Sequence, residues 1–321
     1  MTFLFLIFIL LLLLGTEVGF AMIMAAWLGV EFKTDRFVDL VMLPTSMMSG
    51  ISLYALVAIP LFILAGEVMN RGGITRRLVG FASVWVGRGK GSLGQVSVGA
   101  NTMMAGISGS AVADAGAIGK AMIPEMTAKG YKPAYSSAVI AAGALIGPII
   151  PPSIPMVVYA QMANTSVARM FMSGLIPGLL LAVGFMALCA VIGRIRDLPS
   201  GEKVTWGERL RVSFDALWAL LMPVIILVGI RMGLMTDTEI AAVAVVYAVV
   251  VSLFVYRTMR LSELPALFVA AARSSAVILF LLAAAAPFSW LVAESKIADQ
   301  VVDAIHAIST NPVVVLLIVN L

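Results

Sequence analysis

Eight long apolar runs and the start of a ninth restrict this chain to one class of structure. They lie at residues 2–30, 51–69, 93–119, 134–160, 173–193, 214–233, 240–256 and 274–293, and from 312 onward. A helix needs about 20 apolar residues to cross a bilayer. The 321 residues are 61% hydrophobic and 12% charged, whereas soluble domains are about half apolar and about a quarter charged. The sequence therefore predicts an all-α polytopic membrane protein in a lipid bilayer.

The basic residues lie in short clusters between the apolar runs. The net charge of +4 is thus typical of membrane loops and argues against a nucleic-acid partner. One cysteine and one histidine exclude an internal disulfide and a metal site built from a cysteine or histidine cluster. The run 2–30 has no basic n-region and no small-residue cleavage site, so we expect a retained transmembrane helix, tilted or broken near Gly15 and Gly19.

The run 93–119 differs from the others because its second half, NTMMAGISGSAVADAGAIG, is rich in Gly, Ala and Ser and poor in Leu and Phe. We predict a re-entrant hairpin with its tip near SGS, whose small residues let the two arms pack closely. With the N-terminus in the cytoplasm, this topology puts 16 of the 21 Lys and Arg residues inside, against 13 when the run crosses. The charge distribution favours the hairpin.

A second irregular segment, GALIGPIIPPSIPMVVYA, has four prolines within eight residues. Each proline removes an amide donor and clashes with the preceding helical turn, so we expect a broken helix over 134–160. Its free carbonyl groups could coordinate a cation.

These two segments supply the candidate substrate and Na⁺ site. A carboxylate at membrane depth usually belongs to an ion pathway, helix N-termini bind anionic groups, and unwound carbonyls bind Na⁺. The alternatives are a carboxylate that only stabilises the hairpin, and serines that only pack. The candidates are Asn101, Ser108, Gly109, Ser110, Asp114, Gly147, Pro148, Pro151, Pro152 and Ser153.

Glu17, Glu67 and the enzymatic motifs point to no further site, and Glu17 is interpreted as part of the bend at Gly15 and Gly19. Glu67 precedes Arg71 by four residues, which predicts a helical ion pair. The sequence has no G-x-S-x-G elbow and no G-x-x-x-x-G-K-[ST] loop, and His306 lies far along the chain from Ser108 and Ser110. We expect no enzyme and no organic cofactor.

A weak internal similarity predicts two inverted repeats. Thr16-Glu17-Val18 resembles Thr238-Glu239-Ile240, and LYALVAIPLFILAG from Leu53 resembles VILFLLAAAAPFSW from Val277, at offsets of about 223 residues. We expect a first repeat over 1–200 with scaffold helices over about 1–70, a hairpin over 93–119, a broken helix over 134–160 and a helix over 173–193. A cytoplasmic connector would follow over 194–213. The second repeat, 214–321, would end before its own hairpin, which the offset places near residue 325.

The chain resembles the large membrane subunit of tripartite ATP-independent periplasmic (TRAP) transporters. The similar stretches include IPLFILAGEVMNRGGITRRLV, NTMMAGISGSAVADAGAIGKAMIPEM and GALIGPIIPPSIP, and the resemblance covers essentially all 321 residues. It implies an elevator-type, Na⁺-driven transporter of carboxylates in the bacterial inner membrane. It also implies two partners, a small four-helix membrane subunit and a periplasmic solute-binding protein. The family has a second hairpin and a second PP-containing break, and this chain has neither.

Three other functions stay open from the residues. An ion-coupled dicarboxylate carrier that works without a binding protein would share the hairpin and the broken helix. A non-transporting membrane scaffold would share only the apolar runs. An intramembrane hydrolase would need Ser108 or Ser110 as a nucleophile.

Overall fold

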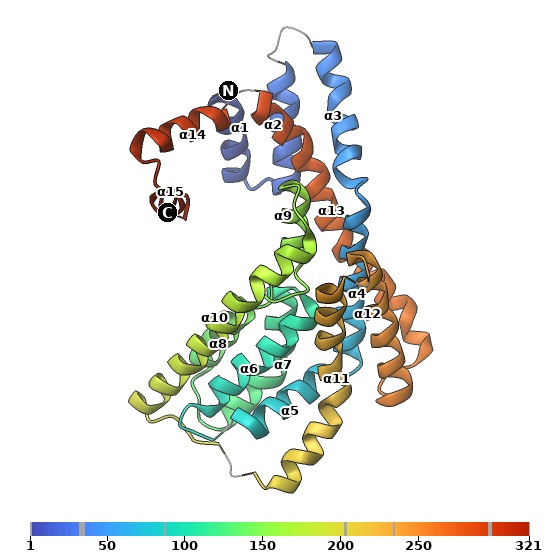
Figure 1. Cartoon of the computed structure of the whole chain (residues 1–321), viewed down its shortest axis with the longest axis vertical. Coiled ribbons are helices and arrows are strands. Elements are labelled where there is room, and N and C mark those ends of the chain that lie inside the picture. Colours follow the sequence, from blue (N-terminus) through green and yellow to red (C-terminus); the bar gives the residue numbers. More distant parts are fainter. Residues whose placement is uncertain are drawn as a thin grey trace. The chain divides into compact units, whose positions relative to one another are not determined.

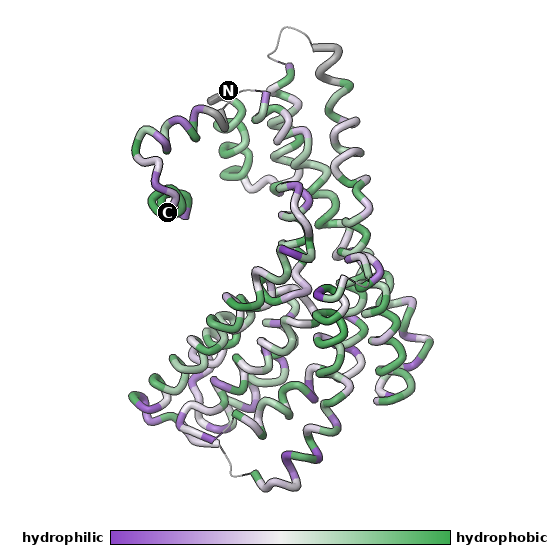
Figure 2. The backbone as a smooth tube through the Cα atoms, in the orientation of Figure 1, coloured by the Kyte–Doolittle hydropathy of each residue, from purple (hydrophilic) through white to green (hydrophobic). Residues whose placement is uncertain are grey.

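The structure is a computed structural model that describes residues 2–31, 36–86, 88–201, 204–233, 235–294 and 297–320 (Figure 1). The regular structure in these residues is helical. Five helical segments in them are long and apolar enough to cross a membrane, namely Tyr54–Arg71, Val167–Ile195, Trp206–Met232, Asp237–Val255 and Leu261–Glu294. In Figure 2, for example, hydrophobic residues follow one another along most of Val167–Ile195. This agrees with the predicted all-α polytopic membrane protein.

The chain forms two compact units, one of residues 1–53 with 276–321 and one of residues 54–275. The first unit contains α1 (Thr2–Leu13), α2 (Val18–Glu31), α3 (Arg36–Ile51), the second half of α13 (Leu264–Glu294), α14 (Ile297–Ile308) and α15 (Pro312–Asn320). The apolar run 2–30 is broken here, as expected, at Gly15, which has a φ of +84°. Gly19 has a different role. A Cβ atom at Gly19 would lie 2.6 Å from the ring of Phe280, so Gly19 allows α2 to pack closely on α13.

The second unit contains the candidate site and is built around one buried helix. Its helices are α4 (Ala58–Arg71), α5 (Ile74–Val86), α6 (Ser92–Ser108), α7 (Ala111–Ala128), α8 (Pro133–Ala144), α9 (Ile154–Met162), α10 (Val167–Ile195), α11 (Trp206–Met232) and α12 (Asp237–Val250). Short helical turns at Tyr54–Val57, Val251–Val255 and Leu261–Glu263 and the first half of α13 complete it. Of these elements, α6 contacts α4, α5, α7, α8, α10 and α11.

The small residues of α6 make these contacts possible. A Cβ atom at Gly94 would lie 3.1 Å from the Tyr135 hydroxyl and 3.2 Å from the Cys189 sulfur. One at Gly106 would lie 3.0 Å from the Pro223 ring. The two arms of the hairpin, α6 and α7, also contact each other. The glycines of α6 in addition bring it close to α8, α10 and α11, because the helix is surrounded on most sides.

Three segments between the predicted apolar runs contain helices. They are 31–50, most of which belongs to α3, 71–91, which contains α5, and 294–311, which contains α14. Charged residues hide these helices from a search for apolar runs, although α5 buries Ile74, Leu78 and Ala82 at helical spacing. Residues 32–35, in the first of these segments, and residues 202 and 203, in the predicted connector, lie outside the described residues.

The two ends of the hairpin formed by α6 and α7 lie at the same place. The backbone amide of Gly91, just before α6, donates to the Pro199 carbonyl over 3.2 Å. The hydroxyl of Tyr131, just after α7, donates to the same carbonyl over 2.9 Å. The hairpin therefore begins and ends beside Pro199, in the segment that follows α10.

A pH-dependent ion pair lies beside the two ends of the hairpin. The Lys90 ammonium donates to the Asp197 carboxylate, and this hydrogen bond, followed by the positive charge, lowers the pKa of Asp197. The stability that this ion pair adds to the folded protein is present at neutral pH and is lost as the pH falls through the folded-state pKa of Asp197. Asp197 has a φ of +49°, which asparagine also tolerates, so Asp197→Asn removes the charge without straining the backbone.

Asp197→Asn is expected to lower the melting temperature slightly at pH 7, because both groups are exposed. The difference from wild type should shrink as the pH falls below the ordinary range of a carboxyl group, since wild-type Asp197 is then protonated as well. Thermal unfolding at several pH values measures it. A deficit of equal size at low and neutral pH would contradict the assignment to this ion pair.

Helices α4 and α12 lie side by side and run in the same direction. Near their first residues, the Thr238 hydroxyl donates to the Tyr54 carbonyl over 3.5 Å. Near their last residues, the Thr258 hydroxyl donates to the Gly72 carbonyl over 2.6 Å. This pairing brings Arg71 to Glu263, with 2.6 Å between the guanidinium Nε and the carboxylate. The predicted ion pair between Glu67 and Arg71 is wrong, because Arg71 turns to a carboxylate on a neighbouring segment.

Candidate functional site

The hairpin reverses direction within two residues. Helix α6 ends at Ser108, Gly109 takes a φ of +60°, and Ser110 begins α7 as its N-cap. The Ser110 hydroxyl accepts from the Ala113 amide over 3.4 Å, and the Ser110 amide donates to the Ser108 hydroxyl over 3.2 Å. Serine is a favourable N-cap because its oxygen binds one of the amides that a helix leaves free at its start. The SGS sequence thus forms the tip, as predicted.

The predicted break lies between α8 and α9. Helix α8 ends at Ala144, and α9 begins after Ser153. The Ser153 hydroxyl accepts from the Met156 amide over 3.3 Å and donates to the Pro148 carbonyl over 2.5 Å. Prolines without amide donors fill the gap, so the helix cannot continue through it. The break is confirmed, and its second half starts from a serine N-cap like that of α7.

The hairpin tip and the break touch each other through two glycines. A Cβ atom at Gly109 would lie 2.3 Å from the Pro152 carbonyl oxygen and 3.2 Å from the Ser153 Cα. A Cβ atom at Gly147 would lie 2.7 Å from the Asp114 Oδ2. Only a residue without a side chain fits at either position. The first turns of α7 and α9 consequently start next to one another.

Asp114 lies at this junction with no exposed surface. One carboxylate oxygen accepts a hydrogen bond from the Ser108 hydroxyl. The other, Oδ2, has no hydrogen-bond partner among the residues that the structure describes. Gly147 lies against this free oxygen, and the position that its Cβ would occupy is also 3.3 Å from the Ala111 amide nitrogen. A buried carboxylate oxygen without a donor is costly, which makes Asp114 Oδ2 a potential ligand for a cation.

Asn101 is the one candidate that lies away from the junction. It is seven residues before the end of α6, which is about 10 Å along a helix. Its amide nitrogen donates to the Ser97 carbonyl over 2.9 Å and lies against Gly143 of α8. Its Oδ1 has no partner in the described part of the chain. The other nine candidates come together as the hairpin turn, the first turn of α7 or the break: Ser108, Gly109, Ser110, Asp114, Gly147, Pro148, Pro151, Pro152 and Ser153.

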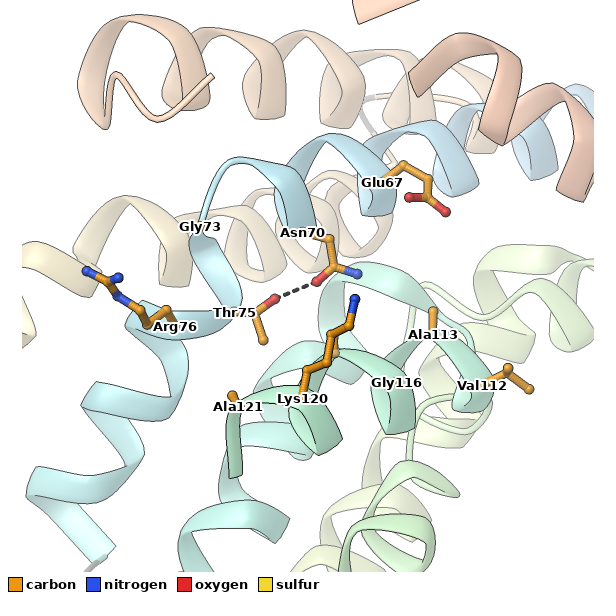
Figure 3. Close-up of a pocket in the computed structure, with 11 residues that line it drawn as sticks. Glu67, Asn70, Gly73, Thr75, Arg76, Val112, Ala113, Gly116, Lys120 and Ala121 are labelled. Atoms are coloured by element: carbon orange, nitrogen blue, oxygen red, sulfur yellow. Dashed lines mark hydrogen bonds between the residues drawn. The ribbon is translucent and has the colours of Figure 1, made fainter. Parts of the chain in front are cut away.

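A cavity of about 610 Å³ opens on the other face of α7 (Figure 3). One wall comes from α4 and the start of α5, with the polar residues Glu67, Asn70, Thr75 and Arg76. The opposite wall is α7, where Ala113, Gly116, Ala117 and Lys120 share one helical face. This cavity was not predicted from the sequence. Two signals for it were available: Glu67 lies within an apolar run, and Lys120 lies at the end of the small-residue segment. Glu67 was instead predicted to pair with Arg71.

Carboxylates, histidines and cysteines do not gather into a group of three or more that could bind a metal anywhere in the described residues. The Ser108 hydroxyl binds a carboxylate and the Ser110 hydroxyl caps a helix. His306 belongs to the other compact unit. The arrangement at the junction therefore suits binding through helix ends, carbonyls and one carboxylate.

These features define a helical membrane protein in which a hairpin of two helices meets a proline-broken helix. Residues 5–321 match the family model of the tripartite ATP-independent periplasmic transporter, DctM component, and the chain belongs to this family. The family suggested by the hairpin and the break is thereby confirmed.

Several relatives are described as large permease proteins of TRAP transporters. The sialic acid permease SiaM of Vibrio cholerae is 35% identical over 311 residues, which is 97% of this chain and 72% of SiaM. The C4-dicarboxylate permease DctM of Pseudomonas aeruginosa is 39% identical over 268 residues, or 84% of this chain and 63% of the relative. The ectoine/5-hydroxyectoine permease UehC of Ruegeria pomeroyi is 34% identical over 317 residues, or 99% of this chain and 74% of UehC. Their description as permeases agrees with the prediction of a protein that is not an enzyme.

Proposed function

We propose that this chain belongs to the membrane subunit of a Na⁺-driven secondary transporter that imports an organic acid. In this proposal a periplasmic solute-binding protein delivers the substrate, and a small four-helix membrane subunit completes the transporter in the bacterial inner membrane. The relatives described above are named for sialic acid, C4-dicarboxylate and ectoine, which supports a small organic acid as the substrate.

The main support is the meeting of two helix N-termini at the junction of hairpin and break. Helices α7 and α9 both start from serine N-caps, and Gly109 brings these starts into contact. The first amides of a helix lack partners within the helix and give its N-terminus a partial positive charge. Two such ends side by side favour a negatively charged group, such as a carboxylate.

The coupling ion would bind at the same junction, which also offers oxygen ligands to a cation. The free Oδ2 of Asp114 supplies a negative oxygen, and the carbonyls between Ala144 and Ser153 supply neutral ones. Oxygen ligands of this kind suit Na⁺ at a broken helix. Binding Na⁺ would neutralise Asp114 and thereby make the junction more favourable for a carboxylate, which couples the two ligands.

The hairpin would be re-entrant, entering and leaving the bilayer on the cytoplasmic side, with the N-terminus also cytoplasmic. This is supported by the two hydrogen bonds to the Pro199 carbonyl, which hold both ends of the hairpin at one place. Movement of the hairpin and the broken helix together across the bilayer, as in an elevator, would carry the junction from one side to the other.

Uptake in proteoliposomes tests this function. The full-length protein, the small membrane subunit and the solute-binding protein are combined, and uptake of a labelled C4-dicarboxylate, sialic acid or ectoine is measured with and without an inward Na⁺ gradient. We expect uptake of one of these only with both the gradient and the binding protein. Uptake that ignores Na⁺ would refute the coupling. Na⁺-driven uptake without the binding protein would favour a stand-alone carrier.

A further inference from the structure

The cavity between α4 and α7 has charged groups without partners. In the residues that the structure describes, neither Lys120 nor Glu67 forms an ion pair or a hydrogen bond. Other basic residues of this unit do have partners, for example Lys90 with Asp197 and Arg77 with Asp215. Lys120 is exposed and Glu67 is half-buried, so both charged groups are accessible to a ligand that enters the cavity.

Asn70 is held in an orientation that offers donors to the cavity. The Thr75 hydroxyl, which is 7% exposed, donates to the Asn70 Oδ1 over 2.6 Å. The Asn70 amide nitrogen is therefore turned away from Thr75, and it has no acceptor among the described residues. In Figure 3 this nitrogen and the Lys120 ammonium both point into the space between α4 and α7. Two donors, one of them charged, converge there from opposite walls.

The shape of the cavity follows from the small residues of α7. Ala113, Gly116 and Ala117 form its floor, and a Cβ atom at Gly116 would have no neighbour within 4 Å. The cavity extends along α7 from Val112 to Ala121, about 14 Å of helix. One end, at the exposed residue Val112, lies two residues beyond Ser110, the N-cap at the hairpin tip. The cavity thus runs along α7 from beside the hairpin tip to Lys120.

Glu67 adds a constraint on the ligand. Its carboxylate lies on the same wall as Asn70, one helical turn earlier, and faces the cavity (Figure 3). A second carboxylate on a ligand bound at Lys120 would approach this like charge. A hydroxyl or ammonium group would instead donate to it.

We propose that this cavity binds an organic acid that carries one carboxylate and further hydrogen-bond donors, with the carboxylate at Lys120 and Asn70 and a donor group at Glu67. The inference rests on the proposed function and extends it. The cavity is a second binding position for the substrate, beside the hairpin tip, and it favours hydroxylated or zwitterionic monocarboxylates over dicarboxylates.

Protection of Lys120 from a lysine-acetylating reagent tests the proposal. Purified protein in lipid nanodiscs is treated in Na⁺-free choline buffer with D-gluconate, a polyhydroxy monocarboxylate, or succinate, a dicarboxylate, at matched ionic strength. Acetylation of each lysine is measured by mass spectrometry. Lys129, near the end of the same helix and outside the cavity, is the internal control. We expect gluconate to slow the acetylation of Lys120 at least about fivefold at saturation, to leave Lys129 unchanged, and to bind more tightly than succinate.

Three variants assign this protection to the cavity. Asn70→Ala should raise the gluconate concentration for half protection about tenfold, because a charge-assisted hydrogen bond is lost. Glu67→Gln should bring succinate close to gluconate. Thr75→Val releases the Asn70 amide and should act like Asn70→Ala if that variant folds poorly. Equal protection of Lys120 and Lys129, or protection unaffected by Asn70→Ala and Thr75→Val, would overturn the proposal.

The two proposals fail in different ways. Protection needs neither Na⁺ nor the partner subunits, so uptake that ignores Na⁺ would refute the proposed function while protection of Lys120 persists. Na⁺-driven uptake together with unprotected Lys120 would refute the cavity site alone.

Discussion

Gly109→Val is expected to disrupt the junction between the hairpin tip and the broken helix. Gly109 has a φ of +60°, and its Cβ would lie 2.3 Å from the Pro152 carbonyl oxygen. The left-handed conformation costs a residue with a side chain about 1–2 kcal/mol, and overpacking adds about 1–3 kcal/mol. The neighbouring atoms are backbone and cannot rotate away. We expect the variant to lose about 2–5 kcal/mol of stability and all transport.

Thermal unfolding of the purified variant and the uptake assay check this expectation. Gly184→Ala is the matched control, because Gly184 lies in α10 and a Cβ there has no neighbour within 4 Å. It should melt at or slightly above the wild-type temperature and transport normally. If Gly109→Val melts with wild type and still transports, the contact between tip and break does not matter to the fold or to transport.

Asp114→Asn is expected to weaken the binding of Na⁺ during uptake, with little change in the stability of the protein. Asparagine keeps the size of the side chain, and its carbonyl can still accept from the Ser108 hydroxyl. The lost feature is the negative charge of the free Oδ2 beside Gly147. Loss of one charged ligand contact is worth about 1.5–3 kcal/mol, or about 10–150-fold. We therefore expect the Na⁺ concentration for half-maximal uptake to rise by about this factor.

A Na⁺ titration of uptake in wild type, Asp114→Asn and Ser108→Ala separates two roles of the carboxylate. Ser108→Ala removes the hydrogen bond but leaves the charge, so its half-maximal Na⁺ concentration should change less than that of Asp114→Asn. An unchanged Na⁺ requirement in Asp114→Asn, with a lower melting temperature, would mean that Asp114 only stabilises the hairpin.

The elements of the candidate site could be predicted because each leaves a local signal. The Gly, Ala and Ser content of 93–119 predicted the hairpin, and the prolines after Gly147 predicted the break. Their contact through Gly109 and Pro152 could not be predicted, since it joins residues 43 positions apart and depends on how α6 packs among its neighbours. Sequence order shows which groups are available but not which of them meet.

The cavity was missed for a related reason. A four-residue spacing assigned Glu67 to Arg71, whereas the parallel packing of α4 and α12 gives Arg71 a closer partner in Glu263. Helix spacing identifies possible pairs within one helix, but a neighbouring helix can compete for either member. The free carboxylate of Glu67 is the result of that competition.

The two hydrogen bonds to the Pro199 carbonyl affect how the hairpin can move. The Gly91 amide and the Tyr131 hydroxyl both donate to this oxygen, so both legs of the hairpin are bound to the same residue after α10. Sliding one leg past the other would break at least one of these hydrogen bonds. Each hydrogen bond contributes about 0.5–1.5 kcal/mol, so their joint presence favours movement of both legs together with the segment that follows α10.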